Sequence, residues 1–296
     1  MSALKQITAL LQDPPPEFAF EIAADGIAMS RTRPPSEVQH ASLAPGILEP
    51  SPVKGNVLDA AAFAEVVRKL VPAASGKGKR SAALILPDNC VRIAVLDFDT
   101  LPEKEEERLS LIRFRLRKSV PFDIDEAALS YFPQSPKSVI AVIAPSEVIA
   151  QYEAPFRAAG LHPGLVTISS LAMLELLPIT GSLLLARISP GALTILAVKD
   201  GLITIARSLE MAAIHSLEEV SAAIYPTMAY IEDQSGGRPE QLFVAGFGSE
   251  SFAAATQLSV ELEVPVEPLS GDSPGLAGYL ASLKQPVKAP VKAKAA

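Results

Sequence analysis

The chain has 296 residues, of which 49% are hydrophobic, so it can bury one large core or the cores of two moderate domains. Its 26 basic and 33 acidic residues give a net charge of -7, which argues against nucleic acid as the main partner. No apolar run reaches the ~20 residues that a membrane span requires, and the N-terminus lacks the basic start and apolar core of a signal peptide. The composition therefore predicts a cytoplasmic protein.

The first residues are apolar at helical spacing. Leu4, Ile7, Leu10 and Leu11 can share one face of a short helix that ends before Pro14. A helix packed against its own domain is favoured over one that lies on a membrane surface.

The next residues predict the beginning of a sheet. Residues 18–31, FAFEIAADGIAMSR, have the pattern of a β-hairpin that turns at Ala-Asp-Gly, and residues 37–47 offer a third strand. Asp59 is suited to cap the helix that follows. That helix carries four apolar residues on one side, namely Phe63, Val66, Val67 and Leu70.

Residues 81–160 predict two strands, a helix, two strands and a second helix. The first helix, within 102–119, begins with carboxylates and ends with cations, an order that suits the helix macrodipole. The second helix begins at Ser146, which is suited to cap it, and ends at Gly160. This ββαββα order predicts a compact sheet with helices on one face.

The last block, residues 181–283, begins with strands at 183–188, 193–198 and 202–207, the last two joined by the tight turn Lys-Asp-Gly. A helix at about 217–234 follows, and the chain then alternates strand, helix, strand and helix. The first block has a similar order of strands and helices in a shorter form, but the two blocks show no repeat of individual residues.

Four stretches carry a resemblance to a known family. LIRFRLRKSVPFDIDEAALSYF contains a helix that ends in a basic Pro-Phe segment, and VIAVIAPSEVIAQYEAPFRAAGLHPGLVTISSLAMLEL contains a strand and a helix followed by Ala-Gly-Leu. The last block contains the other two stretches, GALTILAVKDGLITIARSL and EEVSAAIYPTMAYIEDQSGGRPEQLFVAGFGS. In this order the stretches resemble the PilM family of type IV pilus assembly proteins, although none of them is exclusive to it.

The resemblance implies an α/β, actin-like (ribonuclease H-like) two-domain fold, related to the cell-division protein FtsA, with an inserted ββαββα subdomain. The implied first domain comprises residues 1–80 and 161–180, the insert 81–160, the second domain 181–283 and a disordered tail 284–296. The resemblance also implies a cytoplasmic scaffold that docks on the inner-membrane platform of a pilus machine. Its partner there would be the N-terminal tail of a PilN-like membrane protein, with self-association and other platform components left open.

The first phosphate loop of the implied fold is altered in this chain. Actin-like ATPases hold phosphates on two hairpin loops with an Asp-x-Gly pattern, whose carboxylates position a magnesium ion and water. Here Glu21 stands where the family has Asp, and Ala23 stands where it has Gly. Asp25 adds a negative charge beside them.

The second phosphate loop departs further from the pattern. Arg187 takes the Asp position, Ser189 the Gly position, and Pro190 has no N–H to offer a phosphate. Arg187 cannot serve as a base. Two interpretations stay open: Arg187 binds a phosphate in place of the metal's charge, or it pairs with a nearby carboxylate such as Glu21, which is favoured.

A third element lies where the fold receives adenosine. Gly246 and Gly248 stand between a strand and a helix, although such a turn uses glycine anyway. Together the three segments predict a degenerate pseudo-ATPase with no catalytic residue. ATP or ADP stays a candidate ligand without hydrolysis, and no cofactor is required.

Other chemistry is not indicated. His40, His162 and His215 are too far apart in the sequence for a metal spacing, so no metal site is predicted. Cys90 has no activating neighbours, which favours a buried packing thiol over a nucleophile. The sequence contains no Gly-x-Ser-x-Gly, Walker A or Rossmann motif.

Partner binding has a physical basis in the implied insert. A groove between the first domain and the insert can accept an extended peptide, by strand addition or in pockets. Its candidate lining residues are Val120, Pro121, Phe122 and Tyr131, with packing of the insert's own core as the alternative.

Three functions compete with that of a scaffold. They are an active actin-like ATPase or kinase, a GspL-like platform protein of type II secretion, and an FtsA-like filament former. GspL-like proteins continue into a membrane span and FtsA-like proteins carry an amphipathic C-terminal helix, and neither pattern stands in this sequence.

Overall fold

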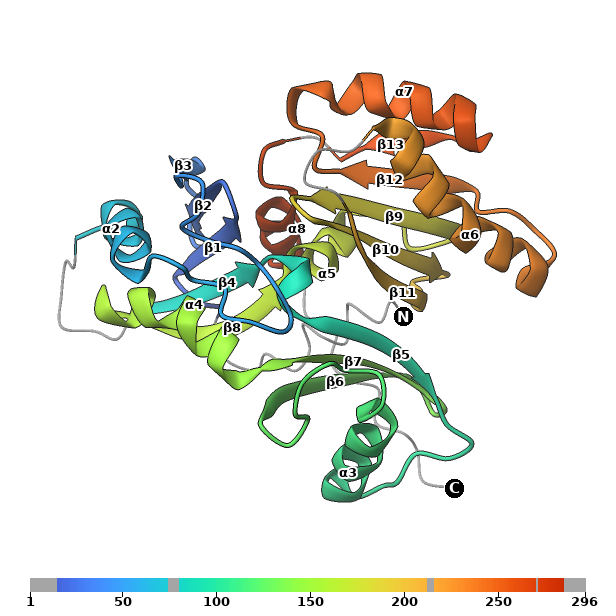
Figure 1. Ribbon diagram of the computed structural model, residues 1–296, viewed down its shortest axis with the longest axis horizontal. Coiled ribbons are helices and arrows are strands. Elements are labelled where there is room, and N and C mark those ends of the chain that lie inside the picture. The colour runs from blue at the N-terminus through green and yellow to red at the C-terminus, as the bar shows by residue number, and fades with distance from the viewer. Residues whose placement is uncertain (1–14, 74–79, 212–215, 270, 285–296) are drawn as a thin grey trace.

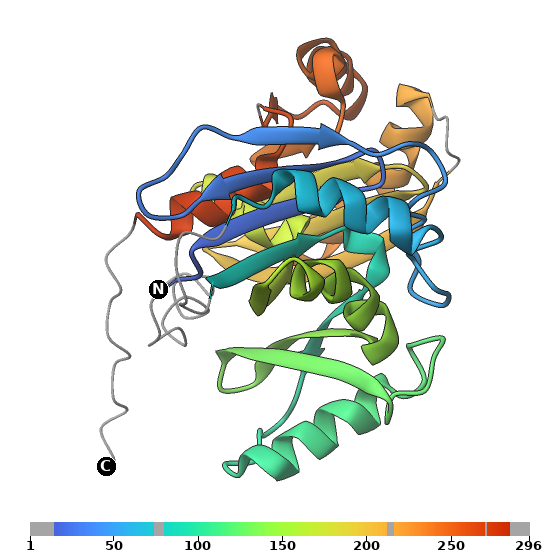
Figure 2. The same ribbon diagram turned by 90° about the vertical axis from the view of Figure 1, so that its left-hand side faces the viewer.

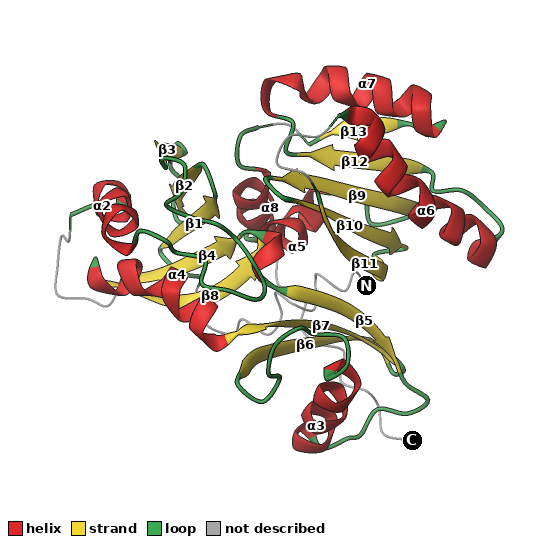
Figure 3. Ribbon diagram, in the orientation of Figure 1, coloured by secondary structure: helices red, strands yellow, loops and turns green. Residues whose placement is uncertain are grey.

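The computed structural model describes residues 15–73, 80–211, 216–269 and 271–284. They form two five-stranded sheets and one three-stranded sheet, with helices on the sheet faces (Figures 1 and 3). The predicted α/β class is confirmed. The predicted N-terminal helix, His215 and the predicted tail beyond Lys284 lie outside the described residues.

The first domain is built on the sheet of order β3-β2-β1-β4-β8. Its strands are β1 (Phe18–Ala23), β2 (Gly26–Arg31), β3 (Gln39–Ser42), β4 (Arg80–Leu86) and β8 (Leu161–Ile168). The first three form the predicted antiparallel meander, while β4 runs parallel to both β1 and β8.

The two faces of this sheet carry side chains of different size. On one face Phe18 and Phe20 pack with Phe63 and Phe156, so that large aromatic rings fill the space beneath two helices. These helices are α2 (Ala60–Leu70) and α4 (Ser146–Ala158). The opposite face, where Ala19 lies, has small side chains that let helices approach closely.

The helices on the small-residue face come from distant parts of the chain. They are α5 (Ser169–Met173), the 3-10 turn η2 (Leu174–Leu176) and the C-terminal helix α8 (Pro274–Ser282). Leu276 and Tyr279 of α8 are buried against this face. The prediction that the chain up to residue 283 belongs to the second domain is therefore wrong for α8, since the apolar side of this helix is covered by the first sheet.

Two of the predicted helix ends can be checked in detail. Asp59 accepts the N–H of Ala62 at 2.9 Å and so caps α2, as predicted. Ser146 does not cap α4, because its hydroxyl donates to the carbonyl of Glu126 at 2.7 Å. The helix ends at Ala158, and Gly160, the predicted stop, follows two residues later in a left-handed conformation with φ of 79°.

The insert is a separate three-stranded layer of order β5-β7-β6, which lies below the first domain in Figure 2. It consists of β5 (Arg92–Asp97), β6 (Ala127–Ser135), β7 (Ser138–Pro145) and α3 (Glu105–Leu116). The predicted element order over 81–160 is present, but the expectation of one compact sheet is wrong. β4 is buried along most of its length and sits inside the first sheet, where both of its faces are covered, and α4 packs on that sheet as well.

The second domain has the sheet order β11-β10-β9-β12-β13. Its strands are β9 (Ser182–Ser189), β10 (Ala192–Lys199), β11 (Leu202–Glu210), β12 (Gln241–Ala245) and β13 (Val266–Pro268). Asp200 and Gly201 both have positive φ, so the Lys-Asp-Gly segment forms the tight hairpin turn that the sequence predicts.

Two long helices cover one face of the second sheet, α6 (Leu217–Ser235) and α7 (Ser251–Leu262). The other face, with Leu185 and Leu196, continues into the core of the first domain. None of the helices in the described part of the chain is long and apolar enough to cross a membrane.

Candidate functional site: a cleft between the two domains

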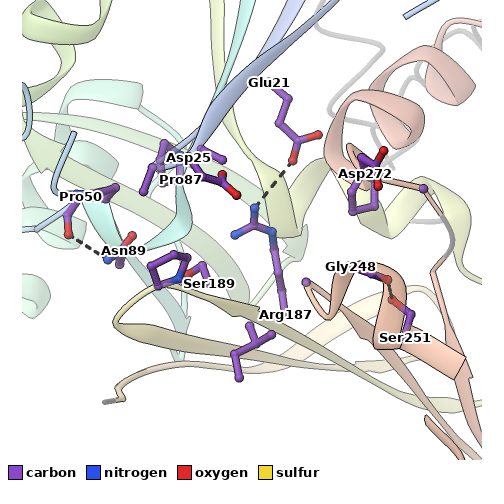
Figure 4. Close-up of a pocket in the computed structure, with 17 residues that line it drawn as sticks. Glu21, Asp25, Pro50, Pro87, Asn89, Arg187, Ser189, Gly248, Ser251 and Asp272 are labelled. Carbon is purple, nitrogen blue, oxygen red and sulfur yellow. Dashed lines mark hydrogen bonds and ion pairs between the residues drawn. The ribbon is translucent and has the colours of Figure 1, made fainter. Parts of the chain in front are cut away.

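A cleft of about 440 Å³ lies where the two domains face each other, and turns from both domains line it (Figure 4). The first domain contributes the β1–β2 turn and the segment after β4, and the second contributes the β9–β10 turn and the segment after β12. The structure brings together all seven residues of the predicted nucleotide site, namely Glu21, Ala23, Asp25, Arg187, Ser189, Gly246 and Gly248. The loop before α8 adds Asp272, which sequence reasoning missed.

Arg187 reaches across the cleft to the first domain. Its Nη2 lies 3.7 Å from Oε1 of Glu21, and its Nη1 lies 3.6 Å from Oδ2 of Asp88 (Figure 4 shows the first of these pairs). The exposed fractions of the three side chains are 9%, 5% and 0%, so this is a buried cluster of one cation and two carboxylates. The pairing with Glu21 is the interpretation of Arg187 that the sequence favoured.

Glu21 is held by two further hydrogen bonds on the small-residue face of the first sheet. The hydroxyl of Ser169 donates to Oε1, and the backbone N–H of Leu276 donates to Oε2, both at 2.8 Å. Leu276 lies in the first turn of α8, so the carboxylate also satisfies a free N–H at the positive end of that helix. Burial raises the pKa of Glu21, while the charge of Arg187 and the two hydrogen bonds oppose that shift.

The close approach of Glu21 to α8 depends on a glycine. A Cβ at Gly275 would lie 2.6 Å from Oε1 of Glu21 and 3.1 Å from Cα of Ser169, well inside contact distance. Sequence reasoning missed Gly275, because nothing in the local pattern of a helix start shows that a strand from the other end of the chain packs there.

Asp88 is the second carboxylate of the cluster, and sequence reasoning interpreted it only as a turn residue. It stands in η1 (Asp88–Cys90), directly after β4, and is completely buried. Its Oδ1 accepts the backbone N–H of Ser170 at 2.8 Å, and its Oδ2 has Arg187 as its ion-pair partner. An acidic residue close to the apolar run of residues 82–86 was the available signal, since a buried carboxylate needs a cation or hydrogen-bond donors.

The residues of the cleft do not fit a magnesium–polyphosphate group. The guanidinium of Arg187 lies between the carboxylates that would otherwise face a metal, and Asp25 and Asp272 add negative charge along the wall. In the described parts of the chain no group of three or more His, Cys, Asp or Glu side chains is arranged to hold a metal ion. Pro190 offers no N–H at the tip of the second loop.

The glycine pair has a backbone explanation of its own. Gly246 has φ of +100°, and a Cβ there would lie 2.0 Å from the carbonyl oxygen of Ile188. Gly248 also has a positive φ, of +53°. The turn between β12 and α7 therefore requires glycine whether or not a ligand lies beside it.

The four candidate residues of the peptide groove differ in their burial. Val120, Phe122 and Tyr131 are half-buried and pack against the core of the insert, whereas Pro121 is exposed. The hydroxyl of Tyr131 accepts a hydrogen bond from Arg108 at 3.3 Å. For three of the four, packing of the insert's core is thus the contact that the structure shows.

The remaining candidates have ordinary environments. The Cys90 thiol is buried, donates to the carbonyl of Pro87 at 2.9 Å, and has a pKa raised by burial, as befits a packing thiol. His40 and His162 lie exposed on different strands of the first sheet.

Solved structures share this architecture. The PilM–PilN type IV pilus biogenesis complex matches with a TM-score of 0.74 and 18% identity, over 93% of this chain and 100% of that chain. A protein of Bacteroides thetaiotaomicron with an actin-like ATPase fold and unknown function matches with a TM-score of 0.53 and 12% identity, over 89% of this chain and 94% of that chain. The cytoplasmic domain of EpsL, an inner-membrane component of the type II secretion system of Vibrio cholerae, matches with a TM-score of 0.51 and 10% identity, over 77% of this chain and 80% of that chain.

No protein-family model matches the chain, and neither does any curated protein. At these identities the structural similarity shows the fold. The chain has the PilM-like, actin-like ATPase fold that the sequence predicts.

Proposed function

We propose that this chain is a PilM-like platform protein of a type IV pilus or related machine, cytoplasmic and peripheral to the inner membrane. Its role is to bind the N-terminal tail of a PilN-like membrane protein. The observation that carries the proposal is the correspondence with PilM, which was solved in a complex with PilN and which this chain matches over 93% of its own length and all of that chain.

The β6 edge of the insert, which pairs with no further strand in the described part of the chain, is a suitable place for an extended tail. β6 is an edge strand of the sheet β5-β7-β6, and Pro121 lies exposed in the loop that leads to it. A peptide that adds to such an edge gains main-chain hydrogen bonds, while neighbouring pockets read its side chains.

The first prediction concerns this tail. A fluorescent peptide with the N-terminal sequence of the bitopic membrane protein encoded beside this chain should bind saturably, as measured by fluorescence anisotropy. Pro121→Glu should weaken that binding about tenfold, because it puts a charge at an exposed apolar position beside the edge strand.

The matched control is Val260→Glu, which puts the same charge at an exposed apolar position of α7 in the second domain. It should leave the affinity for the peptide unchanged. Absence of binding to the unmodified chain, together with normal pilus assembly in a deletion strain, would defeat the proposal.

The second prediction is that the cleft has no hydrolytic activity. Arg187 stands where the family resemblance places a carboxylate and cannot act as a base, so the second loop lacks the carboxylate that would position magnesium and the attacking water. We expect the purified protein to release no phosphate from ATP above background in the presence of Mg²⁺. Turnover that disappears in the variant Glu21→Ala would contradict this expectation.

A platform protein of type II secretion is the second candidate, because the cytoplasmic domain of EpsL shares the fold at a TM-score of 0.51. The same peptide assay separates the two candidates. Binding to the tail of a type II secretion membrane protein, and not to that of a PilN-like protein, would favour the second.

A further inference from the structure

We propose that the ion pairs of Arg187 hold the two domains in one fixed arrangement. The geometry of the cleft then does not depend on a nucleotide. The inference rests on the proposed absence of catalysis in this cleft. The inference extends that proposal from the chemistry of the cleft to the conformation of the molecule.

The charges of the cluster come from different domains. Arg187 belongs to β9 of the second domain, whereas Glu21 and Asp88 belong to β1 and η1 of the first. Separation of the domains would take the cation away from two carboxylates that are nearly inaccessible to water while the domains are in contact. The loss of one partner from a buried ion pair is strongly unfavourable, and this opposes opening.

Both carboxylates are also held by hydrogen-bond donors of the first domain. Glu21 is held by Ser169 and by the N–H of Leu276, and Asp88 is held by the N–H of Ser170. These donors come from α5 and α8, which pack on the first sheet. A change in the position of Arg187 is therefore not absorbed by rotation of the carboxylates alone.

The second domain is also connected to the insert. Gln134, at the end of β6 in the insert, donates from its side chain to the carbonyl of Ile203 at 2.8 Å. It also accepts the N–H of Ile203 at 2.7 Å. The side-chain amide thereby satisfies both backbone groups of a residue in β11, which joins the insert to the second domain.

The described residues that line the cleft carry more negative than positive charge. Asp25 and Asp272 line it in addition to Glu21, while Arg187, the one cation among these described residues, lies within 4 Å of two carboxylates. A polyphosphate would add further negative charge to this surface. The cleft is thus suited to stay in one arrangement when nucleotide is added.

A distance measurement between the domains tests the proposal. The exposed residues Glu65 of α2 and Gln257 of α7 are replaced by cysteine and spin-labelled, and Cys90 stays unlabelled because it is buried. Double electron–electron resonance then gives the distribution of distances across the cleft in the full chain. We expect the same narrow distribution without ligand and with millimolar Mg-ATP.

Two variants in the labelled background complete the test. Arg187→Met should broaden the distribution and shift it to longer distances. Arg238→Met, which removes a surface arginine that also pairs with two carboxylates, should leave it unchanged.

The proposal is overturned by any change of the wild-type distribution on addition of Mg-ATP, by an unchanged distribution in Arg187→Met, or by equal broadening in both variants. The nucleotide arm needs only the wild-type side chain at 187, so it decides the question even where Arg187→Met does not fold. A nucleotide-dependent shift without phosphate release would contradict the fixed arrangement of the domains and leave the proposed platform function standing. Failure of the tail peptide to bind would contradict the platform function and leave the fixed arrangement standing.

Discussion

Arg187→Met is expected to lower the free energy of unfolding by about 3–5 kcal/mol, because it removes the cation from a buried cluster and leaves two carboxylates unpaired. Methionine keeps most of the volume of the arginine stem, so the loss reports chiefly on charge. Glu21 and Asp88 stay in place through the donors from Ser169, Leu276 and Ser170 and cannot turn out to solvent. Urea denaturation followed by far-ultraviolet circular dichroism measures the effect, since the chain contains no tryptophan.

The control for this variant is a second arginine with the same number of partners. Arg238 lies 3.2 Å from both Glu232 and Glu263, closer than Arg187 lies to its carboxylates, but 45% of its side chain is exposed. Solvent and salt screen such a pair, so Arg238→Met should leave the midpoint of unfolding almost unchanged. Equal losses in the two variants would show that burial of the cluster around Arg187 is not what stabilises it.

Gly275→Ala is expected to cost about 3 kcal/mol, at the upper end of what an added methyl group costs in a packed interior. The new Cβ would meet the carboxylate of Glu21 and the backbone of Ser169, and neither can move without breaking its other contacts. The variant should therefore also loosen the hydrogen bond from Leu276 to Glu21. Hydrogen exchange at the N–H of Leu276 would detect this separately from global unfolding.

Gly164→Ala is the matched control for the glycine prediction. Gly164 lies in β8 of the same sheet, its φ is not in the left-handed region, and a Cβ there would meet nothing within 4 Å. The stability should stay the same or rise slightly, because alanine restricts the unfolded chain more than glycine does. A loss in Gly164→Ala as large as that in Gly275→Ala would point to a general intolerance of alanine in this sheet and not to the contact with Glu21.

The parts of the site that could be predicted from the sequence lie on single hairpins. The turn after β1 and the turn after β9 are each set by short-range patterns, and these patterns placed Glu21 and Arg187 near the ends of the strands that lead into the two turns. The fold resemblance then supplied the arrangement in which hairpins from two domains meet. No long-range information about individual side chains was needed for this step.

The parts that could not be predicted depend on contacts between distant segments. Asp88 is a turn residue by local pattern, and only the arrival of Arg187 from the other domain makes it half of an ion pair. Likewise, the apolar run of β4 is compatible with a strand of the insert or of the first sheet. In the structure β4 pairs with β1 along one edge and with β8 along the other, and helices cover both faces of this sheet.

The position of α8 has a consequence for how the chain is made. A ribosome releases β1 long before α8, yet the carboxylate of Glu21 depends on an N–H that lies 255 residues further along the chain. Until that helix emerges, the small-residue face of the first sheet lacks the part of its cover that α8 provides. The first domain is therefore completed only after the strands of the second domain have been translated, and its early strands must wait in a partly uncovered state.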